Sequence, residues 1–283
     1  MALAPTIDLL RAARIGGYGI PAFNVIGLEH AEAIVRGAEA ERAPVILQVS
    51  ENAVKYHGGA IEPIAAACRA LAEAASVPVA LHLDHATSRA LCERAVAAGF
   101  GSVMLDESAL PLADNERQVA DLVRWAHARG VAVEGMLGMV GGKEGMRDTA
   151  EERTDPVEAA AYVARTGVDA LAVAVGTTHG MVERTARIDL GLVSALRAAV
   201  PVPLVLHGSS GVSDADLAAA VRHGMTKINL ATQLNQAFTA TIRACLEANP
   251  AQVDPRRYLA PARDAVEAVV RDRLRLLGGA GRG

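Results

Sequence analysis

The run His82-Leu83-Asp84-His85 closes an apolar stretch and contains residue types that suit acid–base and metal chemistry. Alternate side chains of an extended strand share a face, so His82 and Asp84 would point one way and His85 the other. Asp84 and His85 can enter one pocket only if the chain turns sharply where the strand ends. There, a carboxylate beside an imidazole could transfer protons and bind a metal ion. By itself the run is weak support, because histidines near strand ends often have structural roles.

Polar side chains also end the seven other expected strands. Each unpaired polar group buried at a strand end costs about 1–3 kcal/mol, so such endings are uncommon by chance. Their repetition predicts a shared functional site. In chain order these residues are Asn24, Gln48 with Ser50, Asp106, Glu134, His179, His207 and Asn229.

Three histidines, His85, His179 and His207, lie at three different strand ends. Three protein ligands with one or two open positions are typical of catalytic zinc, because a substrate oxygen must enter the coordination sphere. The spacing therefore predicts a catalytic zinc site at which these side chains converge. His82 has the opposite strand parity from His85, so we expect it to support the site from the core.

Glycines and hydroxyl side chains surround two of these histidines, in GTTHG at 176–180 and HGSSG at 207–211. A third segment, NLAT at 229–232, follows the last expected strand. Glycine allows backbone N–H groups to approach an anion, and hydroxyls add donors. Glycines also make tight turns, which is the simpler interpretation of either loop alone. Two such loops beside two candidate ligands favour a phosphate site.

A long glycine-rich segment, 137–156, follows the fifth expected strand. Loops of this length are uncommon in compact barrels unless they act as lids. We therefore expect a mobile active-site loop. Glu144 lies in its glycine-rich part and would be delivered to the substrate on closure.

Short β-branched runs alternate with Ala-rich segments of helical periodicity along the whole chain. Alternating βα units imply parallel pairing, and eight of them predict a single-domain TIM (β/α)₈ barrel over 1–283. An open doubly wound sheet would favour a GxGxxG turn after an early strand, and the sequence has none. We expect strands at 20–24, 45–50, 79–84, 102–106, 131–135, 170–176, 202–207 and 227–230. Helices are expected between them at 29–42, 61–75, 89–98, 115–128, 157–166, 190–199 and 214–223, with an additional helix at 5–15 and a last helix at 262–277.

The composition limits the partners of this chain. Of its 283 residues 51% are apolar and only 3% aromatic, and the net charge is −4. No basic stripe interleaved with aromatics supports nucleic-acid binding, and no apolar run is suited to spanning a membrane. The N-terminus does not resemble a signal peptide, and the three cysteines are widely spaced. We therefore expect a cytoplasmic protein.

The sequence resembles the class II, metal-dependent ketose-bisphosphate aldolases, which include fructose- and tagatose-bisphosphate aldolases. The similarity runs nearly end to end through PAFN at 21–24, HLDH at 82–85, GTTHG at 176–180, LHGSS at 206–210 and KINLAT at 227–232. It implies a TIM barrel, one catalytic Zn²⁺, often a monovalent cation (Na⁺ or K⁺) near the phosphate, and a homodimer or homotetramer. The implied reaction is reversible cleavage of a ketose 1,6-bisphosphate, through a metal-stabilised enediolate, to dihydroxyacetone phosphate and glyceraldehyde 3-phosphate.

The same resemblance implies a role for each matching residue. His85, His179 and His207 would bind zinc, Asp84 would be the acid/base at the C4 oxygen, and Glu144 would transfer the proton at C3. The phosphate of the three-carbon donor would be held by Gly180, Gly208, Ser210 and Thr232. Asn229 would contact the hydroxyl or enediolate, while Asn24, Gln48 and Ser50 would line the pocket. Arg256 would bind the distal phosphate.

The chain departs from the family in the fifth strand. The family commonly has Glu-x-Glu-Leu-Gly there, and in this chain Met136 replaces the second glutamate. A thioether cannot replace a hard carboxylate, so we expect no second metal site there. The alternatives are a paralogue acting on another phosphorylated keto-sugar or keto-acid, a zinc hydrolase, and a non-catalytic sugar-phosphate binding protein. Retention of Asp84 and Glu144 with the three histidines argues against the last. The configuration of the substrate at C4 remains open.

Overall fold

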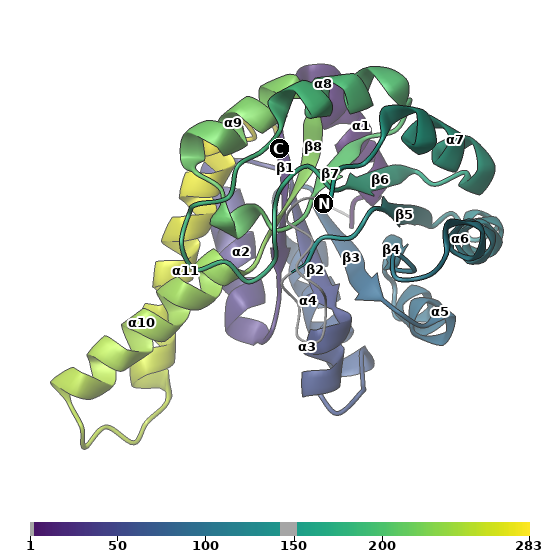
Figure 1. The fold of residues 1–283 in the computed structure, drawn as a ribbon. Helices are drawn as coiled ribbons and strands as arrows, with labels where there is room; N and C mark the ends of the chain where they lie inside the picture. The colour runs from purple at the N-terminus through teal and green to yellow at the C-terminus, as the bar shows by residue number, and fades with distance from the viewer. Residues whose placement is uncertain (1–2, 142–151) are drawn as a thin grey trace.

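The computed structural model describes residues 3–141 and 152–283 and shows a closed parallel barrel in which each strand pairs with the next and β8 pairs with β1 (Figure 1). The predicted TIM barrel is confirmed. The strands are β1 (Ile20–Asn24), β2 (Val45–Ser50), β3 (Val79–Ala86), β4 (Ser102–Leu105), β5 (Ala132–Leu137), β6 (Ala170–Val173), β7 (Leu204–Leu206) and β8 (Met225–Leu230).

Helices surround the strands, as Figure 1 shows. Their bounds are α1 (Thr6–Gly16), α2 (Leu28–Glu41), α3 (Glu51–Tyr56), α4 (Glu62–Ala74), α5 (Arg89–Ala97), α6 (Leu112–His127), α7 (Pro156–Thr166), α8 (Leu190–Ala199), α9 (Asp214–His223), α10 (Thr232–Ala248) and α11 (Arg256–Leu276), with a short 3-10 turn, η1 (Ser209–Gly211). Sequence periodicity anticipated most of them but missed α3 and α10. It also began α11 six residues late.

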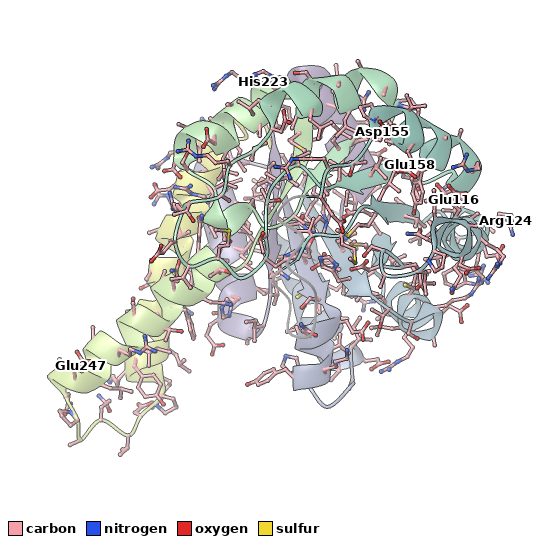
Figure 2. The ribbon with its side chains drawn as sticks, viewed as in Figure 1. Glu116, Arg124, Asp155, Glu158, His223 and Glu247 are labelled. Atoms are coloured by element: carbon pink, nitrogen blue, oxygen red, sulfur yellow. The ribbon has the colours of Figure 1, made fainter. Side chains whose placement is uncertain are left out.

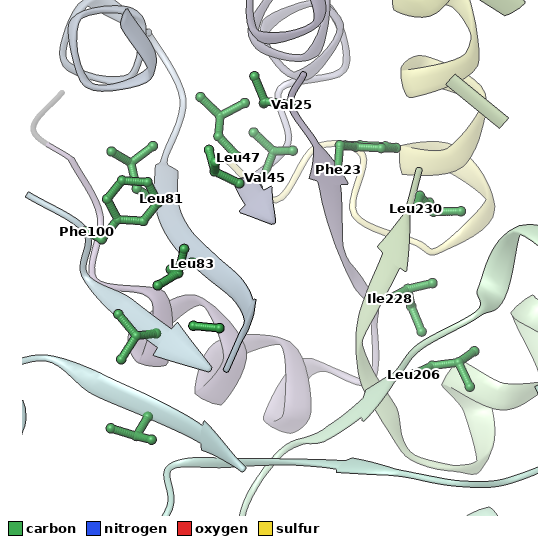
Figure 3. Packing of buried hydrophobic residues seen from close by; sticks show 14 of the residues in the cluster. Phe23, Val25, Val45, Leu47, Leu81, Leu83, Phe100, Leu206, Ile228 and Leu230 are labelled. Atoms are coloured by element: carbon green, nitrogen blue, oxygen red, sulfur yellow. The ribbon is translucent and has the colours of Figure 1, made fainter. Parts of the chain in front are cut away.

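Two apolar cores hold the barrel together. The larger lies between the strands and the outer helices and includes Phe23, Leu47, Leu81 and Leu230 (Figure 3). The smaller lies inside the barrel and includes Ile46, Met104 and Val205. The helix α1 contributes Leu10 and Ala13 to it. Because side chains of a strand alternate between faces, β1 to β7 each contribute to both cores, whereas β8 contributes only to the larger one.

The last two helices form an arm. α10 and α11 pack along one another, and α11 also packs against α2. Their far ends project beyond the barrel (Figure 1), and Glu247 marks the tip of α10 in Figure 2. At about 1.5 Å per residue, the 17 residues of α10 span about 25 Å. The arm therefore extends well away from the strand ends.

In the part of the chain that the structure describes, no helix combines the length and apolar character needed to cross a membrane.

Candidate active site

A cavity of about 410 Å³ opens at the carboxyl ends of the strands. This is where active sites of (β/α)₈ barrels lie, because the βα loops meet there. It brings together residues from β1, β2, β3, the β4 end and the loops after β6, β7 and β8. Those predicted from sequence that line it are Asn24, Gln48, Ser50, Asp84, His85, Asp106, His179, Gly180, Gly208, Ser210, Asn229 and Thr232.

An irregularity in β3 places Asp84 and His85 in the same cavity. The β3–β4 register shifts between Leu83 and Ala86, which both pack in the outer core. Two residues thus occupy the space that one would fill in a regular strand. His85 adopts φ +50°, a left-handed conformation that is uncommon for a side chain other than glycine. This is the sharp turn that the sequence required, and such strained residues concentrate at functional sites.

The three candidate ligand histidines converge. His85, His179 and His207 each offer a ring nitrogen, and these atoms lie within 4.8 Å of one another. Their ring centroids are 4.5–5.6 Å apart and the rings are nearly perpendicular. Within the described ranges no other cluster of histidine, cysteine and acidic side chains has this geometry.

Hydrogen bonds on the far side of two rings determine which nitrogen faces the centre. His85 Nδ1 lies 2.5 Å from Asp106 Oδ2, and His207 Nε2 lies 3.0 Å from Glu134 Oε1. Because a carboxylate can only accept, each of these ring nitrogens donates its proton. The opposite nitrogens, His85 Nε2 and His207 Nδ1, then face one another at 2.8 Å with their lone pairs. A shared cation would stabilise this contact, so the donor set fits a metal ion.

The neutral state of His207 also suits a metal ligand. Burial and the neighbouring His85 ring lower the pKa of His207 below its ordinary value. A ligating imidazole must be unprotonated at the coordinating nitrogen. The amide nitrogen of Asn229 lies 3.2 Å from His207 Nδ1, so the position on β8 borders the same centre.

Deeper in the barrel interior than the three histidines lies a buried cluster of charged and polar side chains. Glu134 and Lys227 form an ion pair of 2.9 Å, with His82 Nε2 3.6 Å from the same carboxylate. Burial alone would raise the pKa of Glu134, but Lys227 and the hydrogen bond from His207 outweigh it and hold the pKa far below its usual range. Burial, reinforced by Lys227, lowers the pKa of His82 to about 3. His82 is therefore neutral, and its Nδ1 pairs with Ser102 Oγ at 2.7 Å.

The placement of Glu134 corrects the sequence interpretation. We expected it to end the fifth strand at the barrel mouth, but β5 continues to Leu137. Glu134 therefore lies one layer deeper, beneath His207, and does not line the cavity. Met136 is buried in the inner apolar core. No carboxylate occupies that position.

The loops after β6 and β7 approach each other closely at Gly208. Its φ is +67°, and a Cβ there would lie 2.7–2.9 Å from backbone atoms of Thr178. Gly180 also has a positive φ, of 72°. Next to them, η1 presents Ser210, and α10 begins at Thr232. Backbone donors at a helix start beside glycine turns can hold a phosphate.

Amide side chains from β1, β2 and β8 also line the cavity. Gln48 Nε2 donates to Asn24 Oδ1 over 3.1 Å. The remaining acceptors, Gln48 Oε1 and Asn229 Oδ1, are buried and have no donor among the described residues. Buried acceptors are costly when unpaired, so both are suited to ligand hydroxyls or water. Ser50 lines the cavity and also caps α3 by accepting from the Ala53 N–H at 3.2 Å.

Two of the described site residues do not line the cavity. His207 is completely buried and meets His85 and His179 in the histidine cluster without lining the cavity. Arg256 starts α11 at the far end of the arm, where its side chain is 88% exposed and paired with Asp254 at 2.8 Å. It does not line the cavity. Glu144 and the rest of 142–151, half of the segment 137–156, lie outside the described residues.

Sequence reasoning missed one side of the cavity, which α3 supplies through Glu51, Asn52 and Lys55. Lys55 pairs with Glu51 at 2.6 Å, and Glu51 accepts from the Thr87 N–H at 2.6 Å. The signal was present, since Ser50 followed by Glu51 is typical of a helix start immediately after β2.

Comparison with known proteins identifies the family to which this barrel belongs. Residues 4–282 match the family model "Fructose-bisphosphate aldolase class-II". Fructose-bisphosphate aldolases of Thermus caldophilus and Geobacillus stearothermophilus are 41% and 39% identical, over 99% and 100% of this chain and 99% of each relative. The crystal structure of the YdjI aldolase from Escherichia coli K12 superposes with a TM-score of 0.87 at 33% identity, over 99% of both chains.

The chain therefore belongs to the class II fructose-bisphosphate aldolase family and is a lyase.

Proposed function

We propose that this protein is a zinc-dependent aldolase that reversibly cleaves fructose 1,6-bisphosphate to dihydroxyacetone phosphate and glyceraldehyde 3-phosphate. The observation that carries the proposal is the convergence of three histidine nitrogens next to a cavity that Asp84 and two glycine-hydroxyl loops line. Fructose is favoured over the C4 epimer tagatose because both curated relatives are named fructose-bisphosphate aldolases.

His85, His179 and His207 would hold the zinc ion, with Asp106 and Glu134 orienting two of the rings. When bound, zinc would supply Lewis-acid polarisation of the ketone. Three imidazoles suit zinc and leave room for substrate oxygens. No second acidic ligand is available at Met136, so we propose a single ion.

Asp84 would act as the base in cleavage. It is 4% exposed and lies next to His85, with 3.8 Å between Asp84 Oδ1 and His85 Nε2. In cleavage, Asp84 takes the proton of the C4 hydroxyl, C4 becomes the aldehyde carbon, and the C3–C4 electrons pass to the donor fragment. The proton that C3 then needs would come from Glu144.

The donor phosphate would sit against Gly180, Gly208, Ser210 and Thr232, which line the same cavity. A monovalent cation, Na⁺ or K⁺, would offset its charge. The unpaired acceptors on Gln48 and Asn229 would bind substrate hydroxyls.

Arg256 would serve the distal phosphate of a substrate in a second copy of the chain, within a homodimer or homotetramer. Its own cavity is about 25 Å away by the length of α10. The cation that lines the same chain's cavity is Lys55, although Glu51 already pairs with it.

A coupled assay for dihydroxyacetone phosphate tests the proposal over fructose and tagatose bisphosphates, monophosphates and phosphorylated keto-acids. We expect fructose 1,6-bisphosphate to be cleaved fastest, and Asp84→Ala to abolish cleavage while zinc stays bound. If the zinc-loaded enzyme released dihydroxyacetone phosphate from none of these substrates, the aldolase assignment would be refuted. Unchanged turnover of Asp84→Ala would refute the role of Asp84.

A further inference from the structure

Lys227 is a lysine completely buried inside the barrel. It lies on β8, opposite Ile20 of β1 and Val205 of β7, and its side chain is 0% exposed. The other side chains of the barrel interior include apolar residues such as Ile46, Ala172 and Val205. An ammonium group in this position needs a specific partner, which Glu134 provides at 2.9 Å.

Burying this ion pair in the barrel costs free energy. Removing each ion from water costs several kcal/mol, and well-packed apolar residues of similar volume commonly give equal or greater stability. The other interior positions show that this barrel accommodates such residues. Stability alone therefore does not explain a lysine at position 227.

Glu134 connects Lys227 to the histidine centre. Lys227 Nζ contacts Oε2, while Oε1 accepts the Nε2–H of His207 at 3.0 Å. The carboxylate thus has one oxygen fixed on each side. With Lys227 holding Oε2, the carboxylate plane is set and Oε1 remains directed at the imidazole. The proton on His207 Nε2 in turn leaves Nδ1 to face His85 Nε2.

We propose that Lys227 is a positioning residue that fixes the tautomer and orientation of His207 through Glu134, and thereby sets the affinity of the centre for its metal ion. The inference rests on the proposed metal site. Outer partners of ligand histidines have this effect in metal centres, where their loss weakens binding about 10–100-fold.

A direct covalent role for this lysine does not fit the structure. Schiff-base formation requires a free amine that the substrate carbonyl can reach. Lys227 Nζ is paired with Glu134, completely buried, and outside the cavity lining.

Lys227→Met tests the proposal because methionine retains much of the volume and removes the charge. Zinc affinity would be measured by competition with a chromophoric chelator, and the His207 tautomer by ¹⁵N NMR of the metal-free, histidine-labelled protein. Ile46→Val, a change inside the barrel but outside the ion pair, controls for packing. A double-mutant cycle with Glu134→Gln tests whether Lys227 acts through Glu134.

We expect Lys227→Met to weaken zinc binding about 10–100-fold and to reduce the population of the Nε2–H tautomer, with Ile46→Val unchanged. In the Glu134→Gln background, Lys227→Met should cause little further loss. A folded Lys227→Met protein with wild-type affinity and tautomer, or independent effects in the cycle, would overturn the proposal. If Lys227→Met does not fold, Glu134→Gln alone decides, since unchanged affinity there removes the connection.

Failure of the proposed metal site would be visible separately. Wild-type protein that binds no zinc would refute that site, whereas the His207 tautomer of metal-free protein would still report on Lys227. An unchanged tautomer in Lys227→Met, beside normal zinc binding by the wild type, would refute the positioning role alone.

Discussion

Gly208 offers a sharp test of how closely the loops over the barrel mouth are matched. It follows His207 directly and has φ +67°. A Cβ at this position would lie 2.7 Å from the carbonyl oxygen of Thr178, 2.8 Å from its carbon and 2.9 Å from its nitrogen. Thr178 precedes His179, so Gly208→Ala presses directly on the backbone that carries a second candidate ligand.

The size of the effect follows from these distances. Ordinary contacts of a Cβ begin at 3.4 Å, so the two loops must separate by about 0.7 Å. The atoms that a Cβ at Gly208 would meet belong to the Thr178 backbone, so no flexible side chain can move aside. Misplacement of catalytic groups by about 1 Å can cost about 100-fold in rate. We therefore expect Gly208→Ala to lower kcat/KM about 10–100-fold and to weaken metal binding by displacing His179.

The left-handed backbone itself adds a separate cost of about 1–2 kcal/mol for any L-residue. Gly17 isolates this contribution, because it has the same φ of 67° but a Cβ there would meet no atom of the described residues within 4 Å. It ends α1, away from the barrel mouth. Gly17→Ala should therefore lower stability by a similar backbone cost and leave kinetics unchanged.

The assay compares both variants for thermal unfolding, zinc affinity and steady-state cleavage of fructose 1,6-bisphosphate. If Gly208→Ala matched Gly17→Ala in kcat/KM and zinc affinity, the close approach of the two loops would have no bearing on the site, and the reasoning would be wrong.

Three further results are expected. Treatment with a chelator should abolish cleavage and added zinc should restore it; activity that survives complete metal removal would contradict a metal-dependent reaction. Asp106→Asn should weaken zinc binding about 10–100-fold, because the amide accepts more weakly from His85 Nδ1 than a carboxylate does, and equilibrium competition would measure this. The folded pKa of His82, about 3, lies below its unfolded value near 6.5, so stability should fall as pH drops from about 6.5 towards 3. His82→Gln should reduce that fall in denaturant titrations, and an identical pH dependence would exclude His82 as a cause.

Periodicity in the sequence was sufficient to predict the barrel. β1 and β2 match their expected bounds, and α9 begins and ends where predicted. These elements have strong apolar patterns and clear flanking signals, such as Ser213, which caps α9. The helix α10 gives a weaker signal because only Gln233 and Leu234 are buried, and much of its length packs on α11 rather than on the sheet.

The sequence predicted the residue types of the site better than it predicted how deep in the barrel each side chain lies. Strand parity indicated that Asp84 and His85 required a turn, yet the register shift that provides it depends on how β3 pairs with β4. Likewise, the strand signal at residue 134 could not reveal that β5 extends three residues further. A short difference in strand length moves a side chain by a whole layer, from the mouth to the interior.

The position of Glu134 changes how the metal centre should be understood. Had it lain at the mouth, it would have been a candidate ligand or base in contact with substrate. One layer deeper, it accepts a hydrogen bond from His207 and faces the charge of Lys227. Along the barrel interior, apolar side chains lie near α1, the ion pair follows, and the histidines come last. Because the pair is held on two strands rather than on loops, it can keep His207 in one orientation while the surrounding loops adapt to the substrate.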